Sequence, residues 1–127
     1  PVTGKLVYVN AGHYPPVILG PGGCAQLDST GMPVALLPGV QEREVGTCRL
    51  DPGGAILVFS DGIPETSRGG DTYQGSRMRA FVDRAKQRIG TLTAEDVARE
   101  FLDDVTDFRG REPQEDDLTL VVVKRTS

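Results

Sequence analysis

Short apolar runs separated by turn-forming residues fill the first half of the chain. Runs of four to eight β-branched and aromatic residues bounded by Gly, Pro, Asn and Asp are typical of β-strands. One run, from Ala55 to Phe59, is apolar at every position, which suits a strand buried on both faces. The predicted strands of this half are residues 6–9, 17–19, 24–27, 42–50 and 55–59.

Turn chemistry predicts how these strands pair. We expect the first two strands to form a hairpin, because turn-forming residues and a proline pair separate them. The third strand is expected to pair with the second across the glycine-rich turn 20–23. The turn 51–54 is expected to fold the fourth strand back onto the fifth. Residues 31–37 are apolar but contain a proline, so we expect an irregular loop with buried side chains.

Helical spacing replaces this pattern in the second half. Apolar residues at i, i+3, i+4, i+7 and i+11 predict a helix that begins after the N-cap Ser76 and ends at Gly90. A second helix is expected to begin at Thr93, where Asp96 completes a capping box. Its buried face is expected to contain Val97, Phe101, Leu102, Val105 and Phe108. The apolar run 118–123 predicts a last strand.

This order of elements predicts an α+β fold. Strands are grouped together and helices are segregated, so we expect an antiparallel sheet with both helices on one face. The last strand must then return to the sheet. The whole chain, 1–127, is expected to form a single domain.

Composition narrows the class of protein. The chain is 38% hydrophobic and 25% charged with a net charge of -4, as in ordinary globular proteins, and no basic patch suggests nucleic acid. The apolar runs are too short to span a membrane and no signal-peptide pattern is present, so we expect a cytoplasmic protein. Cys24 and Cys48 lack a CxxC spacing and are expected to be packed thiols.

Carboxylates stand at the ends of two predicted strands. Asp61 follows the apolar run at 55–59 and precedes Gly62, which lets a ligand approach the main chain closely. Asp116 and Asp117 immediately precede the last strand. If the two strands are neighbours, Asp61 and Asp116 converge as hard oxygen ligands suited to Mg²⁺ or Mn²⁺. The alternative is that Asp-Gly forms a turn and Asp-Asp is solvated.

Five short motifs occur in an order that matches a known family. Together they resemble the SpoIIE-type branch of the PPM, or 2C-like, metal-dependent serine/threonine phosphatases, over most of the chain. The motifs are NAGHYPP at 10–16, GMP at 31–33, FSDGIPE at 59–65, YQG at 73–75 and QEDDLTL at 114–120.

The resemblance implies a fold, a site and an activity. The fold would be a β-sandwich with flanking helices and a Mn²⁺ or Mg²⁺ centre at one end. Asp61 and Asp116 would be the catalytic metal ligands, with Gly62 and Asp117 beside them, and Asp117 would orient its neighbour or the loop. The activity would be hydrolysis of phosphoserine or phosphothreonine by metal-activated water, with a STAS-type anti-anti-sigma protein as the expected substrate.

One family motif is missing. An upstream Asp-x-x-Gly-x-Gly-like motif, whose aspartate bridges two metals, has no counterpart in this sequence, so the chain resembles the C-terminal portion of the domain. We therefore expect weak metal binding by this chain and a two-metal centre only in the complete domain. Absent strands would leave a sheet edge or an apolar face uncovered, which predicts a homodimer or poor solubility unless a partner covers it. The alternative function is a noncatalytic phosphatase-like interaction module in sigma-factor regulation.

Four further residues near these motifs are expected to be structural or solvated. His13 lies between Gly12 and two prolines, as a turn residue would. Glu65 is expected to support the loop after Gly62. Arg68 and Arg77 could contact a phosphate, but exposed arginines on loops are more common. The substrate-binding residues therefore stay unassigned.

Overall fold

Two helices and three small antiparallel sheets make up the computed structural model, which describes residues 3–21, 23–33 and 44–127. Most of the irregular loop predicted at 31–37 lies outside the described residues. The elements are, in order, β1 (Lys5–Tyr8), β2 (Val17–Gly20), β3 (Gly23–Gln26), β4 (Gly46–Arg49), β5 (Ala55–Phe59), β6 (Ser67–Arg68), β7 (Asp71–Thr72), α1 (Ser76–Arg88), α2 (Ala94–Arg109) and β8 (Leu120–Lys124).

The largest sheet has the strand order β3-β2-β5-β8, and all of its pairs are antiparallel. Its pairing of β2 with β3 across the tight turn confirms the sequence prediction. β5 and β8 pair along their whole length, with Phe59 opposite Leu120 and Ala55 opposite Lys124. The end of β5 therefore meets the beginning of β8, as the two acidic motifs require.

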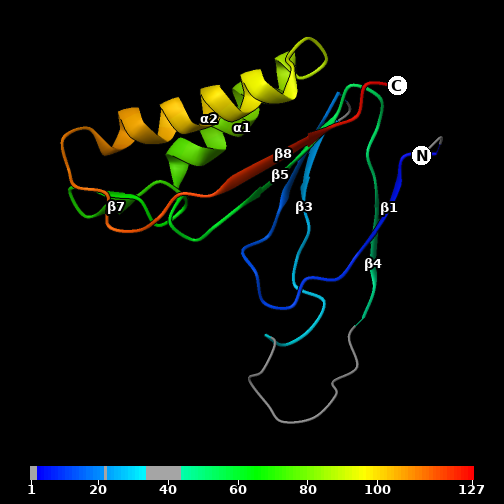
Figure 1. Cartoon of the computed structure of the whole chain (residues 1–127), viewed down its shortest axis with the longest axis horizontal. Coiled ribbons are helices and arrows are strands. Elements are labelled where there is room, and N and C mark those ends of the chain that lie inside the picture. Colours follow the sequence, from blue (N-terminus) through cyan, green and yellow to red (C-terminus); the bar gives the residue numbers. More distant parts are fainter. Residues whose placement is uncertain (1–2, 22, 34–43) are drawn as a thin grey trace.

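Both helices cover one face of this sheet (Figure 1). Side chains alternate across a strand, so Leu57 and Phe59 of β5 face the helices and enter the main core. α1 and α2 add their apolar stripes, with Phe81, Val97 and Phe101 at most 4% exposed. The α+β class and the single helical layer are confirmed. Neither helix in the described part of the chain is long and apolar enough to cross a bilayer.

The helix boundaries follow the sequence with one correction. The capping box is present, because Thr93 Oγ1 accepts from Asp96 N at 3.0 Å and Asp96 Oδ2 accepts from Thr93 N at 3.0 Å. Ser76, however, is the first helical residue and not the N-cap. The N-cap of α1 is Gly75, which makes no side-chain cap.

The predicted hairpins of β1 with β2 and of β4 with β5 are wrong. β1 and β4 instead pair with each other in a separate two-stranded sheet, on the opposite side of the four-stranded sheet from the helices (Figure 1). The inner face of this pair carries Leu6, Tyr8 and Cys48, which pack against Ile18 and Ile56 in a second apolar cluster. Burial of the second face of the large sheet thus outweighs the local turn signals.

Turn 51–54 bends the chain without making a hairpin. Gly54 N donates to Asp51 O at 2.9 Å, and Gly53 has a φ of 81° that a side chain would disfavour. Leu50 before the turn belongs to the second cluster, whereas Ala55 after it belongs to the main core. The turn therefore carries the chain from one layer of the sandwich to the other.

One apolar face of the large sheet is only partly covered. Val121 and Val123 of the edge strand β8 are 52% and 50% exposed, and they pair with Val58 and Ile56 of β5. The small β1–β4 sheet packs on Ile56 but leaves the two valines open. This is an uncovered face of the kind expected from the sequence, and the homodimer stays a prediction.

Phe101 joins the helices to the sheet and provides a test of the core. It is 1% exposed and its ring lies 4.9 Å from that of Phe81, 5.4 Å from Phe59 and 5.9 Å from Tyr73. We expect Phe101→Ala to lower the free energy of unfolding by about 3–5 kcal/mol in urea denaturation, because it removes three ring contacts and leaves a cavity. Val121→Ala on the open face should cost about 0.5 kcal/mol. Equal losses would contradict this assignment of the core.

Candidate functional site

Ser60 fastens the end of β5 to the segment that leads into β8. Its N–H donates to Thr119 O at 3.0 Å, and its hydroxyl accepts from Thr119 N at 3.0 Å. The same hydroxyl donates to Asp117 O at 3.2 Å. These three hydrogen bonds hold two segments that lie 57 to 59 residues apart in the sequence side by side.

Gly62 permits the closest approach between the two motifs. A Cβ placed on it would lie 2.3 Å from Asp117 O and 3.3 Å from a methyl group of Leu118. No real side chain fits such a distance, so the main chains can meet only because this residue is glycine. The sequence predicts that this glycine lets a ligand approach the main chain, whereas in the structure the segment at Asp117 makes the close approach.

Asp61 begins a compact turn. Ile63 N donates to Ser60 O at 3.1 Å, and Glu65 N donates to Asp61 O at 3.0 Å. The Thr66 hydroxyl then donates to the carbonyl of Gly62 at 2.8 Å. Main-chain contacts therefore fix the position of Asp61, which itself is exposed.

Asp116 and Asp117 are also exposed, and a hydrogen bond joins them. Asp116 Oδ1 accepts from Asp117 N at 3.1 Å, so the main chain of Asp117 orients the carboxylate of its neighbour. The carbonyl of Asp117 is the group that receives the Ser60 hydroxyl. Asp117 was expected to orient its neighbour or the loop, and both of these contacts are made by its main chain.

The donor set suits a hydrated divalent cation. Carboxylate oxygens are the ligands that Mg²⁺ and Mn²⁺ prefer, and Mg²⁺ often takes only one or two protein carboxylates and keeps several waters. Asp61 and Asp116 offer two such groups on adjoining, solvent-open segments. Among the described residues no group of three or more His, Cys, Asp or Glu side chains is placed to hold a metal. The described residues therefore supply a pair of carboxylates, and not a larger cluster, for a hydrated ion.

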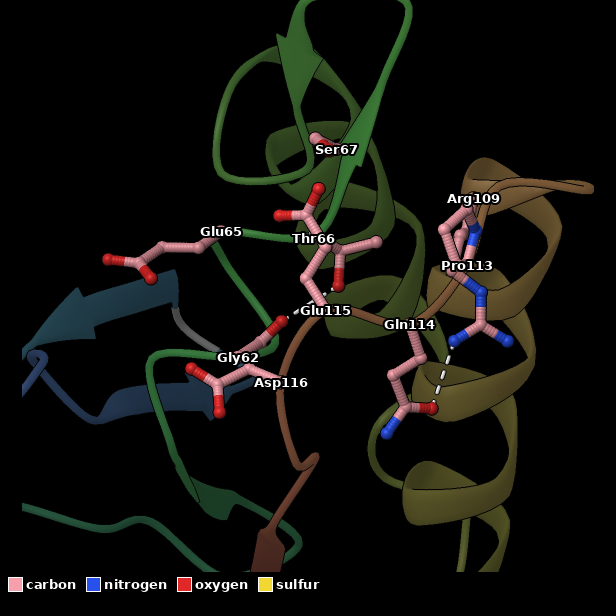
Figure 2. Close-up of a pocket in the computed structure, with 9 residues that line it drawn as sticks. All are labelled: Gly62, Glu65, Thr66, Ser67, Arg109, Pro113, Gln114, Glu115 and Asp116. Atoms are coloured by element: carbon pink, nitrogen blue, oxygen red, sulfur yellow. Dashed lines mark hydrogen bonds between the residues drawn. The ribbon is translucent and has the colours of Figure 1, made fainter.

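A small pocket opens beside Asp116 (Figure 2). It is lined by Gly62, Glu65, Thr66, Ser67, Arg109, Pro113, Gln114, Glu115 and Asp116. Arg109 at the end of α2 donates through Nη1 to Gln114 Oε1 at 2.9 Å. Its Nε is buried and has no hydrogen-bond partner among the described residues. Sequence reasoning missed this residue, because a basic residue in the last turn of a helix is also what the helix dipole favours.

The turn at Asn10 is held by its own side chain. Asn10 is 5% exposed, and its amide donates to the carbonyls of His13 and Leu27 at 3.1 and 3.0 Å. Its Oδ1 accepts from His13 N at 2.8 Å, and its main-chain N–H donates to Thr30 Oγ1 at 2.9 Å. His13 is exposed and part of this turn, in agreement with the structural role expected for it.

Two further contacts bring this turn to the same end of the sheet as Asp61. The ring of Tyr14 lies 5.3 Å from the ring of Phe59, two residues before Asp61. Gly12 has a φ of 82°, and a Cβ on it would lie 2.5 Å from the ring of Pro33. Together with the contacts of Ser60 and Gly62 with Asp117, four of the five sequence motifs therefore pack around one end of the four-stranded sheet.

The remaining candidates are one glutamate and two arginines. Glu65 supports the Asp61 turn through its main-chain N–H and lines the pocket, with its side chain extending away from Arg109 and Gln114 (Figure 2). Arg68 donates to Phe108 O at 3.3 Å. Arg77 is bound to Asp104 at 2.9 Å. Neither arginine is placed at the pocket, consistent with leaving both out of the predicted site.

Known proteins place the chain in a family. The model of the family described as Stage II sporulation protein E (SpoIIE) matches residues 1–126. The chain belongs to this family. Protein IcfG of Synechocystis sp. is 30% identical to it over 129 residues, which cover 97% of the chain and 19% of IcfG.

Solved structures show the same fold. The RsbU and RsbW domains of Rv1364c from Mycobacterium tuberculosis match with a TM-score of 0.74 and 26% identity, over 97% of this chain and 33% of that one. The SiaA-PP2C domain of Pseudomonas aeruginosa matches with a TM-score of 0.72 and 20% identity, over 96% and 47%. The expected PPM-type fold is therefore confirmed. The chain spans less than half of each of these proteins.

The close approach at Gly62 can be tested by adding one methyl group. We expect Gly62→Ala to lower the free energy of unfolding by about 1–3 kcal/mol, because the new Cβ would collide with the main chain at Asp117. Gly90→Ala is the matched control, since a Cβ there has no neighbour within 4 Å. Urea denaturation of both variants measures the difference. A Gly62→Ala protein as stable as Gly90→Ala would show that the two segments do not meet as described.

Proposed function

We propose that this chain is the C-terminal portion of a Mg²⁺- or Mn²⁺-dependent protein phosphatase domain, which removes phosphate from phosphoserine or phosphothreonine in a bacterial signalling protein. The observation that carries the proposal is the convergence of the Asp61-Gly62 turn with the Asp116-Asp117 segment at one end of the large sheet. Membership of the SpoIIE family supports the phosphatase role.

Asp61 and Asp116 are the residues proposed to hold the metal. When bound, the ion would activate a water molecule for attack on phosphorus and neutralise charge on the phosphate. The protein's own contribution is geometric: Ser60 fixes the spacing of the two segments, and Gly62 lets them touch. A structure of the phosphatase domain of SpoIIE from Bacillus subtilis is described as Mn presoaked, and RsbX is described in complex with magnesium. These relatives support the choice of metals.

The expected partner is a phosphorylated protein, and a STAS-type anti-anti-sigma factor is the specific proposal. This choice follows from the family resemblance. A cytoplasmic location agrees with such a partner and belongs to the same proposal. We also propose that residues 1–127 act as part of one domain that includes the upstream metal-bridging motif in the full gene product.

The roles of the two aspartates are tested by isosteric substitution in the full gene product. Asp61→Asn or Asp116→Asn should reduce Mn²⁺-dependent release of phosphate from a phosphorylated STAS protein by at least about a hundredfold, since each removes a charged ligand. The fold should survive, because clustered carboxylates without a metal repel one another. Turnover and thermal unfolding are measured side by side.

Asp83→Asn is the control for this experiment. Asp83 lies on the exposed face of α1 and pairs with Lys86 at 3.0 Å, and exposed ion pairs of this kind contribute little to stability. Its loss should leave turnover unchanged. Full activity in both Asp61→Asn and Asp116→Asn would refute the assignment of the ligands. Absence of turnover in a folded wild-type gene product, on any phosphoprotein, would favour the noncatalytic interaction module.

Arg109 is proposed to contact the substrate. It is the arginine that lines the pocket beside Asp116, and a phosphate or peptide oxygen would satisfy its buried Nε. Arg109→Lys keeps the charge and removes that donor, so we expect KM for the phosphoprotein to rise about three- to tenfold with little change in kcat. Steady-state kinetics decide between this and a structural role, for which KM would stay at the wild-type value.

A further inference from the structure

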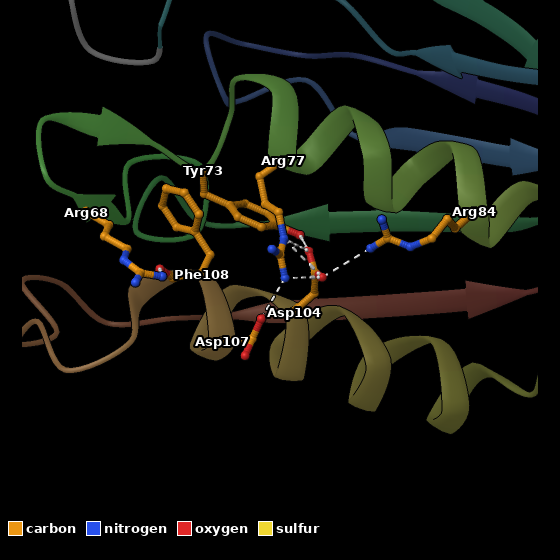
Figure 3. A network of polar contacts seen from close by, with 7 residues as sticks. All are labelled: Arg68, Tyr73, Arg77, Arg84, Asp104, Asp107 and Phe108. Atoms are coloured by element: carbon orange, nitrogen blue, oxygen red, sulfur yellow. Dashed lines mark hydrogen bonds and ion pairs between the residues drawn. The ribbon is translucent and has the colours of Figure 1, made fainter.

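A network of charged and polar side chains joins the loop after β7 to both helices (Figure 3). Its centre is Asp104 of α2, whose side chain is only 11% exposed. Arg77 of α1 donates to this carboxylate through Nε at 3.2 Å and through Nη2 at 2.9 Å. Arg84 donates to it at 3.1 Å, and Tyr73 donates its hydroxyl at 2.8 Å. A carboxylate that is largely removed from water is compensated by several donors at once.

Tyr73 is the member of the network that reaches the core. Its side chain is fully buried, and its ring lies 5.9 Å from that of Phe101 and 5.7 Å from that of Phe108. Burial raises the pKa of Tyr73, and the hydrogen bond to Asp104 raises it further, so the hydroxyl stays protonated as a donor. The ring is therefore held at both ends, by packing around it and by the carboxylate at its tip.

The main chain at Tyr73 supports the turn that carries Asp61. Tyr73 N donates to Thr66 O at 2.8 Å, and the next residue, Gln74, donates to Pro64 O at 3.0 Å. Thr66 in turn donates its hydroxyl to Gly62 O at 2.8 Å. A continuous path of hydrogen bonds thus runs from the Asp104 carboxylate to the residue that follows Asp61.

We propose that Tyr73 and Asp104 are positioning residues, which set the place of the Asp61 turn at the candidate metal site from the interface between α1 and α2. The proposal rests on the proposed function for the role of Asp61 as a ligand. This proposal gives the motif at 73–75 a structural role. Tyr73 supports the Asp61 turn, and Gly75 is the N-cap of α1.

A second ion pair between the same helices provides a control that distinguishes positioning of the Asp61 turn from general stabilisation of the helix pair. Arg88 of α1 donates to Glu100 of α2 at 3.2 and 3.3 Å. This pair joins the helices just as Asp104 and Arg77 do, but within the described part of the chain it makes no hydrogen bond to the loop before α1. Glu100→Gln is therefore the matched control for Tyr73→Phe, which removes one hydroxyl and keeps the ring.

The first measurement needs no metal. Amide hydrogen exchange of the chain is followed at Glu65 and Thr66, in the Asp61 turn, and at Val105, in the core of α2. Tyr73→Phe should speed exchange in the turn about three- to tenfold relative to Val105, since it loosens the local support. Glu100→Gln should leave this ratio at the wild-type value. Equal ratios in the two variants would overturn the proposal.

The second measurement reports on the site itself. Mn²⁺ is titrated into the chain while paramagnetic broadening of the Gly62 and Asp117 amide resonances is recorded by NMR, which detects weak binding. Tyr73→Phe should require about three- to tenfold more Mn²⁺ for half-broadening than Glu100→Gln. Asp104→Asn serves as a second variant and should act in the same direction.

The two measurements distinguish failure of the proposal from failure of the proposed function. If Asp61→Asn leaves Mn²⁺ broadening unchanged, the ligand assignment fails, while the exchange ratio still decides whether Tyr73 holds the turn. If Asp61→Asn abolishes the broadening and Tyr73→Phe changes neither broadening nor exchange, the positioning proposal is refuted and the ligand assignment stands.

Discussion

β5 and β8 pair antiparallel over five residues, and nearly every functional feature of the chain depends on that contact. The pairing brings the end of one strand to the start of the other, so a residue just after β5 lies beside residues just before β8. Asp61 and Asp116 are 55 positions apart in the sequence, and this register brings the segments that carry them side by side. A register shift of one residue would turn the inward-facing side chains of β8 outward, so burial of Leu120 and Val122 against the helices fixes the register.

The positions of the helices and strands could be predicted from the sequence more fully than the pairing of the strands. Alternation, apolar runs and the capping box at Thr93 located the main strands and both helices, because each signal is local. The partner of β1 could not be read in this way. β1 pairs with β4, some forty residues away, since Leu6 and Tyr8 gain burial on the second face of the large sheet. This burial depends on the packing of β1 and β4 against the large sheet, which local sequence does not reveal. The turn residues alone indicate a local hairpin.

The candidate site shows the same division. Asp61 and Asp116 stand beside glycine or a second aspartate at strand ends, and this local chemistry marks them in the sequence. Arg109 and Asp104 act through contacts between a helix and a loop, which no short pattern encodes. The sequence does contain one signal for Asp104. It directly precedes Val105, a residue of the buried stripe of α2, and a carboxylate in such surroundings needs hydrogen-bond partners. This signal predicts that the Asp104 carboxylate has a hydrogen-bond donor, but it does not identify Tyr73 or Arg77 as that donor.

At the candidate site, the groups that hold the two segments together differ from the groups that are available to bind a metal ion. Within the described residues, the hydrogen bonds that join the two segments use Ser60 and main-chain groups, and the carboxylates of Asp61 and Asp116 are left open to solvent. Asp61, Glu115, Asp116 and Asp117 lie on these two segments, and all four are exposed. Like charges on adjoining segments repel, and a divalent cation would relieve that repulsion. A scaffold built from the main chain can bear this repulsion, because the pairing of β5 with β8 and the core beneath it use none of the four side chains.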